Sequence, residues 1–121
     1  MHHSIPILLM ILLTGCDHPD RDRAQTMTGG NYDAGKSTIT LHGCGSCHTI
    51  PGIRGANALV GPPLDRIAAR SYIGGVLPNS PENMVRWIQN APGVDPMTAM
   101  PNLHLTESEA RDVASYLYTL R

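Results

Sequence analysis

The sequence of 121 residues contains no phenylalanine and only five aromatic side chains, four tyrosines and one tryptophan. Large aromatic side chains usually supply much of the apolar volume of a small core. A domain of this length depends on such volume, because a small chain buries a limited share of its surface on folding. The scarcity indicates that something other than aromatic side chains completes the core.

Charge of either sign is not in excess, since 9 Lys and Arg residues stand against 10 Asp and Glu residues. A nucleic-acid binder typically presents a strongly basic surface. The balance therefore excludes nucleic acid as an expected partner. The length in turn excludes a multi-domain enzyme, because a chain of this size forms one domain or less.

The sequence also lacks an apolar run long enough to span a bilayer, which takes about 20 residues. Residues 5–13 are apolar and lead into Leu13-Thr14-Gly15-Cys16, as the apolar part of a secretory signal would. This run resembles a bacterial lipobox. The resemblance implies that residues 1–15 are a signal peptide and that the sulfur of Cys16 carries a diacylglyceryl group. A buried core helix and an ordinary cleaved signal are the alternatives.

The segment that follows Cys16 has almost no large apolar side chains. Residues 17–31 alternate in charge and contain a proline and a glycine pair, with Met27 as the single large apolar residue. This composition predicts a flexible tether over residues 16–31. A charged arm packed on the surface is the alternative, and the sequence does not separate the two.

Cysteine is scarce as well, and two of the three cysteines lie in Cys44-Gly45-Ser46-Cys47-His48. In this C-x-x-C-H pattern, two thiols one helical turn apart can add to the two vinyl groups of a haem, while the adjacent imidazole reaches the iron. With Cys16 assigned to lipid, no cysteine remains for a disulfide within the monomer. The pattern predicts one haem c, attached through Cys44 and Cys47, whose apolar porphyrin would complete the core.

Zinc binding and thiol redox chemistry are the alternatives for this motif. A zinc site needs four ligands, and the remaining histidines are scattered without ligand spacing. A thioredoxin-like redox pair needs alternating strands and helices around it, which the flanking sequence does not indicate. Haem attachment is the favoured interpretation.

Residues 32–121 resemble the class I cytochrome c family. The resemblance rests on the haem motif at residues 44–48, on Gly61-Pro62-Pro63-Leu64 and on the methionine-containing loop at residues 95–101. It implies a small all-α cytochrome c domain over residues 32–121. In this fold, helices wrap around one covalently bound haem and the first and last helices cross.

The resemblance also implies which groups hold the iron. The Pro62 carbonyl would accept a hydrogen bond from Nδ1 of the proximal ligand His48 and so fix the ring. Met100, the methionine followed by proline, would be the second axial ligand. Met97 is its rival, and His104 or an open position is the remaining alternative. A thioether is a soft, neutral ligand that favours ferrous iron.

Further haem neighbours follow from the same resemblance. Arg70 lies eight residues after Pro62, a spacing that matches a propionate-binding arginine in some family members. A solvated arginine at a helix end is the alternative. Trp87 and Tyr72 can donate to propionates, although a single tryptophan on an apolar helix face is more often core packing.

Start signals for four helices occur in the domain, with caps or proline starts at Asp33, Pro63, Ser80 and Thr106. The first helix is expected to reach about Gly43, and Pro92 is expected to stop the third. The resemblance implies that Gly35 and Ile39 of the first helix meet the last one.

The predicted function is one-electron transfer by a carrier that is not an enzyme. Both axial positions of the iron would be filled, so no small-molecule substrate would reach it. Family analogy indicates membrane-bound respiratory complexes, among them a terminal oxidase, as redox partners. A haem enzyme or gas sensor with an open sixth position is the alternative, and an electron-entry module held in a larger complex is a third interpretation.

Cytochromes of this family receive haem after export. The protein is therefore expected at the periplasmic face of the bacterial cytoplasmic membrane, held by a lipid anchor at Cys16, or otherwise soluble in the periplasm. Asp17 after Cys16 resembles the signal that keeps lipoproteins in the inner membrane of enteric bacteria. Anchoring would raise the effective concentration of the carrier near membrane-bound partners.

Overall fold

The computed structural model describes Gly15 and residues 18–121. Cys16 and residues 1–14, to which the predicted lipidation site and signal peptide belong, lie outside the described residues. The elements in chain order are α1 (Pro19–Thr28), α2 (Tyr32–Leu41), the 3₁₀ helices η1 (Cys44–Ser46) and η2 (Ile67–Ala69), β1 (Tyr72–Ile73), β2 (Leu77–Pro78), α3 (Pro81–Gln89), α4 (Ala91–Val94) and α5 (Glu107–Leu117). None of the helices in this part of the chain has both the length and the apolar character needed to span a bilayer.

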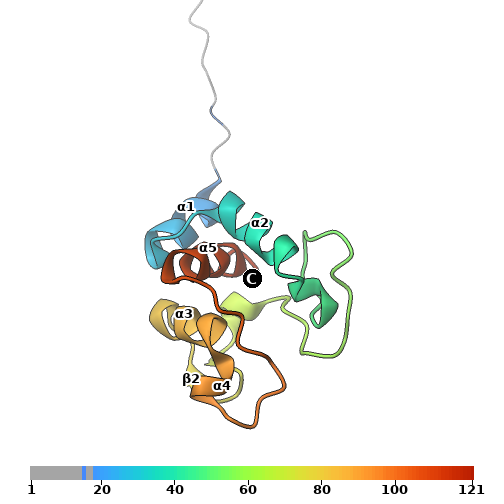
Figure 1. Ribbon diagram of the computed structural model, residues 1–121. Helices are drawn as coiled ribbons and strands as arrows, with labels where there is room; N and C mark the ends of the chain where they lie inside the picture. Colours follow the sequence, from blue (N-terminus) through green and yellow to red (C-terminus); the bar gives the residue numbers. More distant parts are fainter. Residues whose placement is uncertain (1–14, 16–17) are drawn as a thin grey trace, which may run out of the picture.

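The crossing of α2 and α5 forms the centre of the fold (Figure 1). At Gly35 the two backbones approach so closely that a Cβ atom there would overlap the Asp112 carbonyl. Buried apolar side chains from α2, α3 and α5 pack around the crossing: Ile39, Met84, Val85, Ile88, Val113 and Tyr116. The predicted all-α fold and the crossing of the first and last domain helices are confirmed.

Local capping fixes where α3 and α5 begin, as the sequence predicts. The Ser80 hydroxyl accepts a hydrogen bond from the Asn83 N–H at 3.2 Å. At α5, the Thr106 hydroxyl accepts from the Glu109 N–H at 3.1 Å, and the Glu109 carboxylate accepts from the Thr106 N–H at 2.9 Å. These bonds pair N–H groups that a helix start leaves without intrahelical partners.

Two helix ends differ from the prediction. Asn31, rather than Asp33, caps α2, because its side chain accepts from the Ala34 N–H at 2.9 Å. Pro92 lies in the first turn of α4 instead of stopping α3, which ends earlier at Gln89. Proline fits a first turn because the N–H that it lacks would have no intrahelical partner there.

The expected helix after Pro63 is reduced to the short turn η2, and an antiparallel hairpin follows it. Strand β1 pairs with β2 in the register Tyr72 to Pro78 and Ile73 to Leu77. Two-residue strands are too short to leave an alternating pattern in the sequence.

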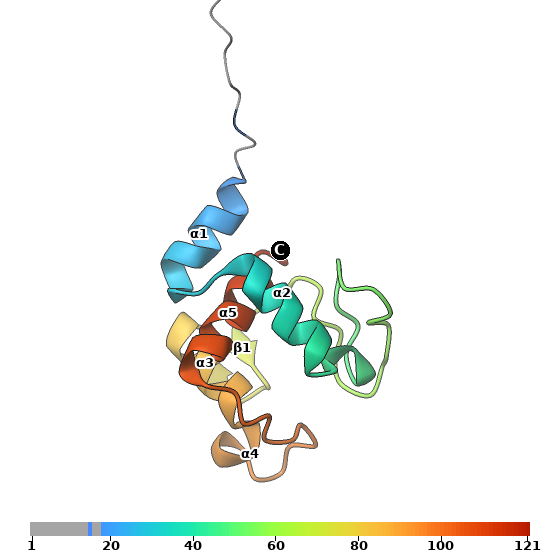
Figure 2. The same ribbon diagram turned by 45° about the horizontal axis from the view of Figure 1, so that its top comes forward.

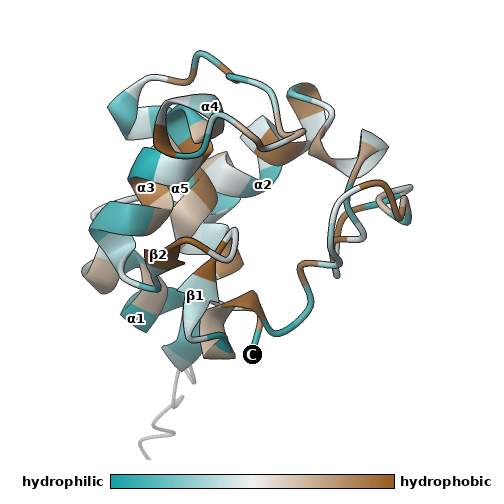
Figure 3. Cartoon of the chain, turned by 90° about the horizontal axis from the view of Figure 1, so that it is seen from below, coloured by the Kyte–Doolittle hydropathy of each residue, from teal (hydrophilic) through white to brown (hydrophobic). Residues whose placement is uncertain are grey.

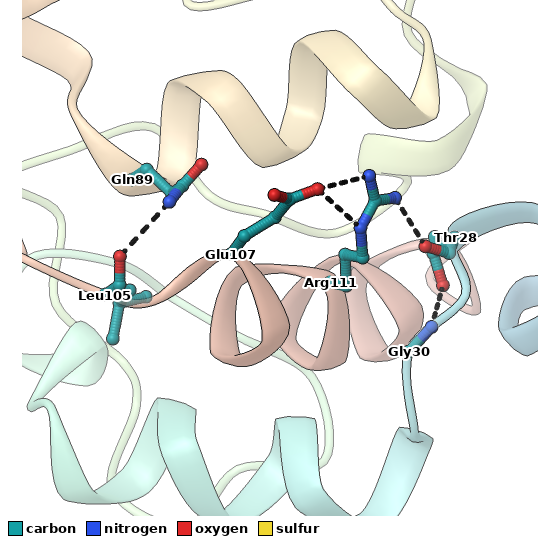
Figure 4. A network of polar contacts seen from close by, with 6 residues as sticks. All are labelled: Thr28, Gly30, Gln89, Leu105, Glu107 and Arg111. Carbon is teal, nitrogen blue, oxygen red and sulfur yellow. Dashed lines mark hydrogen bonds and ion pairs between the residues drawn. The ribbon is translucent and has the colours of Figure 1, made fainter.

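Residues 19–28 show the largest difference from the sequence prediction. They form α1, which packs against α5 with Ala24 and Thr28 almost fully buried, at 0% and 1% exposure. Arg111 of α5 donates from Nη1 to the Thr28 carbonyl at 2.9 Å and is held by Glu107 (Figure 4). The flexible-tether prediction is therefore wrong for this segment, which forms the charged, surface-packed arm. The residues of α1 buried in this contact, Ala24 and Thr28, are small and lie one turn apart. They give the segment no apolar pattern from which the sequence could predict the helix.

Candidate haem-binding site

The two cysteines of the motif lie on η1 and at its end, directly after α2. Gly43 has a φ of 66°, a left-handed conformation that glycine adopts readily and that turns the chain out of α2. The N–H groups of Cys47 and His48 both donate to the Cys44 carbonyl, at 3.2 and 3.1 Å. Both thiols are free and partly buried. One compact turn thus presents two thiols and an imidazole.

The loop after His48 folds back onto this turn. The Ile50 N–H donates to the Ala56 carbonyl at 3.0 Å. A Cβ atom at Gly45 would lie 2.9 Å from Ala56, so this position of the motif is occupied by a residue without a side chain. The contact holds the haem motif against the loop of residues 49–63.

The His48 ring is clamped in one orientation. Its Nδ1 atom lies 2.7 Å from the Pro62 carbonyl. A carbonyl can only accept, so Nδ1 carries the proton and the Nε2 lone pair is available to a metal. A Cβ atom at Gly61 would lie 2.6 Å from Cε1 of the ring, which leaves room for glycine alone. The structure contains the hydrogen bond that the family resemblance implied.

Burial raises the pKa of the Cys44 thiol, and the nearby Cys47 adds to the increase, while a backbone hydrogen bond opposes it. Because the thiolate is the reactive species, the raised pKa lowers the thiolate fraction of Cys44 in the chain before haem is attached.

The two candidate methionine ligands differ in exposure. Met97 is 89% exposed, and its N–H donates to the Asp95 carboxylate at 3.0 Å. Met100 is partly buried, with its N–H donating to the Thr98 hydroxyl at 3.2 Å. Figures 1 and 2 show that their loop, like the loop of residues 49–63, extends from the helical body on the side away from α1.

Exposed apolar side chains accompany the His48 loop. Leu59 and Val60, each 78% exposed, directly precede Gly61, and part of the loop after α2 and η1 is strongly apolar in Figure 3. Adjacent exposed apolar side chains of this kind offer a contact surface to a partner or ligand. Two free thiols, a metal-ready imidazole, a partly buried thioether and uncovered apolar surface fit a haem.

A family model for cytochrome c matches residues 32–121. The chain belongs to the cytochrome c family. A search of curated proteins found no match to it. As a cytochrome c, the chain binds haem c covalently through Cys44 and Cys47, and members of its family are typically haem-based electron carriers.

In this cytochrome, Arg70 braces the chain just after Pro62. Its Nη2 atom donates to the Pro63 carbonyl and, at 2.8 Å, to the Asp65 carbonyl. The Asp65 carboxylate lies 3.8 Å away. Arg70 therefore fixes the segment that carries the carbonyl partner of His48, and a contact with a propionate stays a prediction.

The Trp87 ring lies against Gly74 in the hairpin turn, where a Cβ atom would overlap it. It also packs against the core cluster. Tyr72 is 60% exposed. Trp87 thus has a clear packing role in this cytochrome, and its donation to a propionate stays a prediction.

Sequence reasoning missed the contacts that brace the proximal loop. The Leu64 N–H donates to the Thr49 carbonyl at 2.8 Å, and the Thr49 hydroxyl donates to the Ala58 carbonyl at 2.9 Å. From α5, the Tyr116 hydroxyl donates to the Pro51 carbonyl at 2.5 Å. Their acceptors are carbonyls of irregular backbone, which leave no spacing signal in a sequence.

Proposed function

We propose that this cytochrome is a monohaem electron carrier in which His48 and Met100 are the axial iron ligands. The observation that carries the proposal is the hydrogen bond from His48 Nδ1 to the Pro62 carbonyl at 2.7 Å. It selects the tautomer whose Nε2 is a ligand, holds the ring plane and raises the basicity of the imidazole. When bound, the haem supplies an iron that takes up and releases one electron.

The assignment of Met100 rests on burial and on loop geometry. A ligand to a haem within the fold must turn inward, and Met97 at 89% exposure does not. The Thr98 hydroxyl accepts from the Met100 N–H at 3.2 Å and fixes the backbone at this residue. A thioether ligand would favour the ferrous form and raise the reduction potential.

Filled axial positions would make the protein a carrier rather than an enzyme, because no substrate could bind the iron. The competing function, a haem enzyme or gas sensor, requires an open or easily displaced sixth ligand. Carbon monoxide separates the two functions. The ferrous wild-type protein should bind it slowly or not at all, and its ferric form should show the weak near-infrared sulfur-to-iron band. Rapid carbon monoxide binding by the wild type would contradict the carrier function.

The Met100→Ala variant should bind carbon monoxide rapidly and lose the near-infrared band. Met97→Ala is the matched control. It removes the same type of side chain from an exposed position that lies three residues before Met100. It should behave as the wild type. The reverse pattern would mean that Met97 is the axial ligand of the iron.

For the location, we propose that a diacylglyceryl group on Cys16 holds the protein at the periplasmic face of the bacterial cytoplasmic membrane. The support is the sequence Leu13-Thr14-Gly15-Cys16 after an apolar run. Labelled palmitate should be incorporated by the wild type and not by Cys16→Ser. Equal label in both proteins would refute the anchor and leave a soluble periplasmic carrier.

The proposed redox partners are membrane-bound respiratory complexes, with a terminal oxidase as acceptor. The near balance of 9 basic against 10 acidic residues gives little long-range steering, so anchoring would keep the carrier near these partners. Native mass analysis of membrane extracts tests mobility. A carrier should run free of any oxidase, whereas stoichiometric co-migration would assign it to a permanent complex as an electron-entry module.

A further inference from the structure

A surface hollow of about 510 Å³ lies between α1, η2 and the end of the chain. Neither the Cys44–His48 turn nor Met100 borders it, and Arg70 is the one lining residue that is also a predicted haem contact. The charged side chains of its lining are all arginines, namely Arg23, Arg70 and Arg121. Its apolar lining includes Met27, which is 41% exposed. The hollow therefore combines positive charge with uncovered apolar surface.

Carboxylates near the hollow neutralise the arginines only in part. Asp20 lies 3.9 Å from both Arg23 Nη2 and Arg121 Nε, at the outer limit of an ion pair. The Arg23 and Arg121 side chains are 41% and 49% exposed. Arg70 has Asp65 at 3.8 Å and already donates to two carbonyls. Arg23 and Arg121 thus have donors left for an anion.

The neutral polar groups of the hollow are already paired with one another. The Tyr118 hydroxyl donates to Asn79 Oδ1 at 2.6 Å. The Asn79 Nδ2 atom donates to the Ile67 and Arg70 carbonyls at 3.0 and 2.8 Å. An entering ligand would therefore be recognised by the two guanidinium groups and by the apolar surface around Met27.

The hollow also lies close to the proposed anchor. Cys16 precedes Asp20 by four residues, so the chain can separate their Cα atoms by at most about 14 Å. Asp20 contacts Arg121, and Figure 2 shows the C-terminus near the start of α1. Electrostatic attraction to a membrane surface acts over roughly 8 to 10 Å at physiological ionic strength. A lipid-anchored chain would hold these arginines near the headgroups.

We propose that this hollow binds the glycerophosphate headgroup of an anionic phospholipid, with Arg23 and Arg121 contacting the phosphate and Met27 the apolar part of the lipid. The inference rests on the proposed lipid anchoring of Cys16 for its biological setting. The anchor and the headgroup contact would give two attachment points. Because α1 packs on α5, the two attachment points would orient the whole domain, and the loops around His48 and Met100 would extend away from the attached side.

The test uses the haem-loaded mature chain with Cys16→Ser, which carries no acyl group. Its backbone amide resonances are followed by NMR during titration with monomeric dihexanoyl-phosphatidylglycerol, dihexanoyl-phosphatidylcholine or inorganic phosphate. The phosphatidylglycerol should shift resonances of α1, residues 67–70 and residues 118–121. The other two compounds should bind at least tenfold more weakly. Equal binding of the zwitterionic lipid or of inorganic phosphate would overturn the assignment to an anionic lipid.

Charge variants assign the contact to the hollow. Arg23→Gln/Arg121→Gln should weaken phosphatidylglycerol binding by roughly tenfold or more, because the variant lacks two charge-assisted hydrogen bonds to the phosphate. The matched control is Arg54→Gln/Arg86→Gln, which removes the same charge from exposed positions outside the hollow and should leave binding unchanged. Unchanged binding in the first pair, or equal loss in both pairs, would refute the site.

These results are independent of the anchor. Absence of palmitate on wild-type Cys16 would refute the lipid anchor, whereas the titrations, made without any acyl group, refute or support the headgroup site itself.

Discussion

The stack of α1, α2 and α5 differs sharply from the loops that carry His48 and Met100. In the stack, backbones touch, since a Cβ atom at Gly30 or Gly35 would overlap a carbonyl of α5. In the loops, apolar side chains such as Leu59 and Val60 are exposed, and short turns hold the chain. In the stack, helices of the chain pack directly against one another, whereas the loops offer their apolar surface to a cofactor.

The difference also separates two ways in which the fold is stabilised. The stability of the stack depends on close packing, because glycines and other small residues allow the helix backbones to touch. The haem region depends on the covalent attachment at Cys44 and Cys47 and on the porphyrin that it brings. Segments below about 40 residues rarely fold alone, so we expect the stack and the haem region to depend on each other and on the haem.

The largest expected effect comes from removing the attachment. In Cys44→Ala/Cys47→Ala the chain should lose more than about half of its helical circular dichroism, because neither region then has a sufficient core. Cys16→Ser, which changes the cysteine outside the haem motif, is the control and should keep both the haem and the helical signal. Full helicity in the double variant would mean that the helical stack folds without haem.

The next prediction concerns the contact between helices in the stack of α1, α2 and α5. Gly35→Ala should lower the free energy of unfolding by about 3 kcal/mol or more, because the new methyl group would overlap the Asp112 carbonyl and force α2 from α5. Gly55→Ala, in the loop of residues 49–63, is the control. Its φ is 75° but no atom lies within 4 Å of the added Cβ, so only about 1 kcal/mol is expected. Urea unfolding of both holoproteins measures the difference, and similar losses would contradict the contrast between the regions.

Arg111→Gln should weaken the attachment of α1 to the stack. The substitution removes the hydrogen bond to the Thr28 carbonyl and the ion pair with Glu107 (Figure 4). A loss of about 1 to 2 kcal/mol is expected, since one partner is a charged donor in a partly exposed site. Hydrogen exchange should accelerate in residues 19–28 more than in α2. A uniform acceleration would show that α1 is part of the same cooperative unit.

The smallest effect concerns pH at the end of α5. Burial, with a smaller contribution from Glu82, raises the pKa of Tyr118 to about 12. A raised pKa means that the folded chain retains the phenol proton longer than the unfolded chain, whose tyrosine titrates near about 10. The resulting stability is complete below about pH 10 and is lost as the pH rises through about 12. Tyr118→Phe should flatten the fall in stability over this range, and an unchanged profile would show that Tyr118 has no part in it.

Sequence reasoning succeeded where the signal is local. The haem motif, the caps at Ser80 and Thr106 and the start of α3 at Pro81 depend on a few neighbouring residues, and the structure contains them as expected. The burial of Ala24 and Thr28 depends instead on α5, which is more than 80 residues away in the chain. Because this contact is distant in the chain, the charged composition of residues 19–28 predicts a flexible tether, whereas the segment folds as a helix.

The candidate site shows the same limit. The pairing of His48 with Pro62 was available from the family resemblance, because both belong to short motifs. The sequence favours Met100 over Met97 because a proline follows Met100, and the lower exposure of Met100 supports the same choice although the two share one loop. The exposed apolar surface of the His48 loop was also out of reach, since exposure depends on how the loop folds back on η1.

Ligation of the iron by Met100 is tested most directly by proton NMR of the ferrous holoprotein with methyl-labelled methionine. A methionine that binds the iron has its methyl group above the porphyrin plane, where the ring current shifts the resonance far upfield. Ligation by Met100 predicts one such methyl resonance, present in Met97→Ala and absent in Met100→Ala. An upfield methyl that survives in Met100→Ala, or none in the wild type, would contradict it.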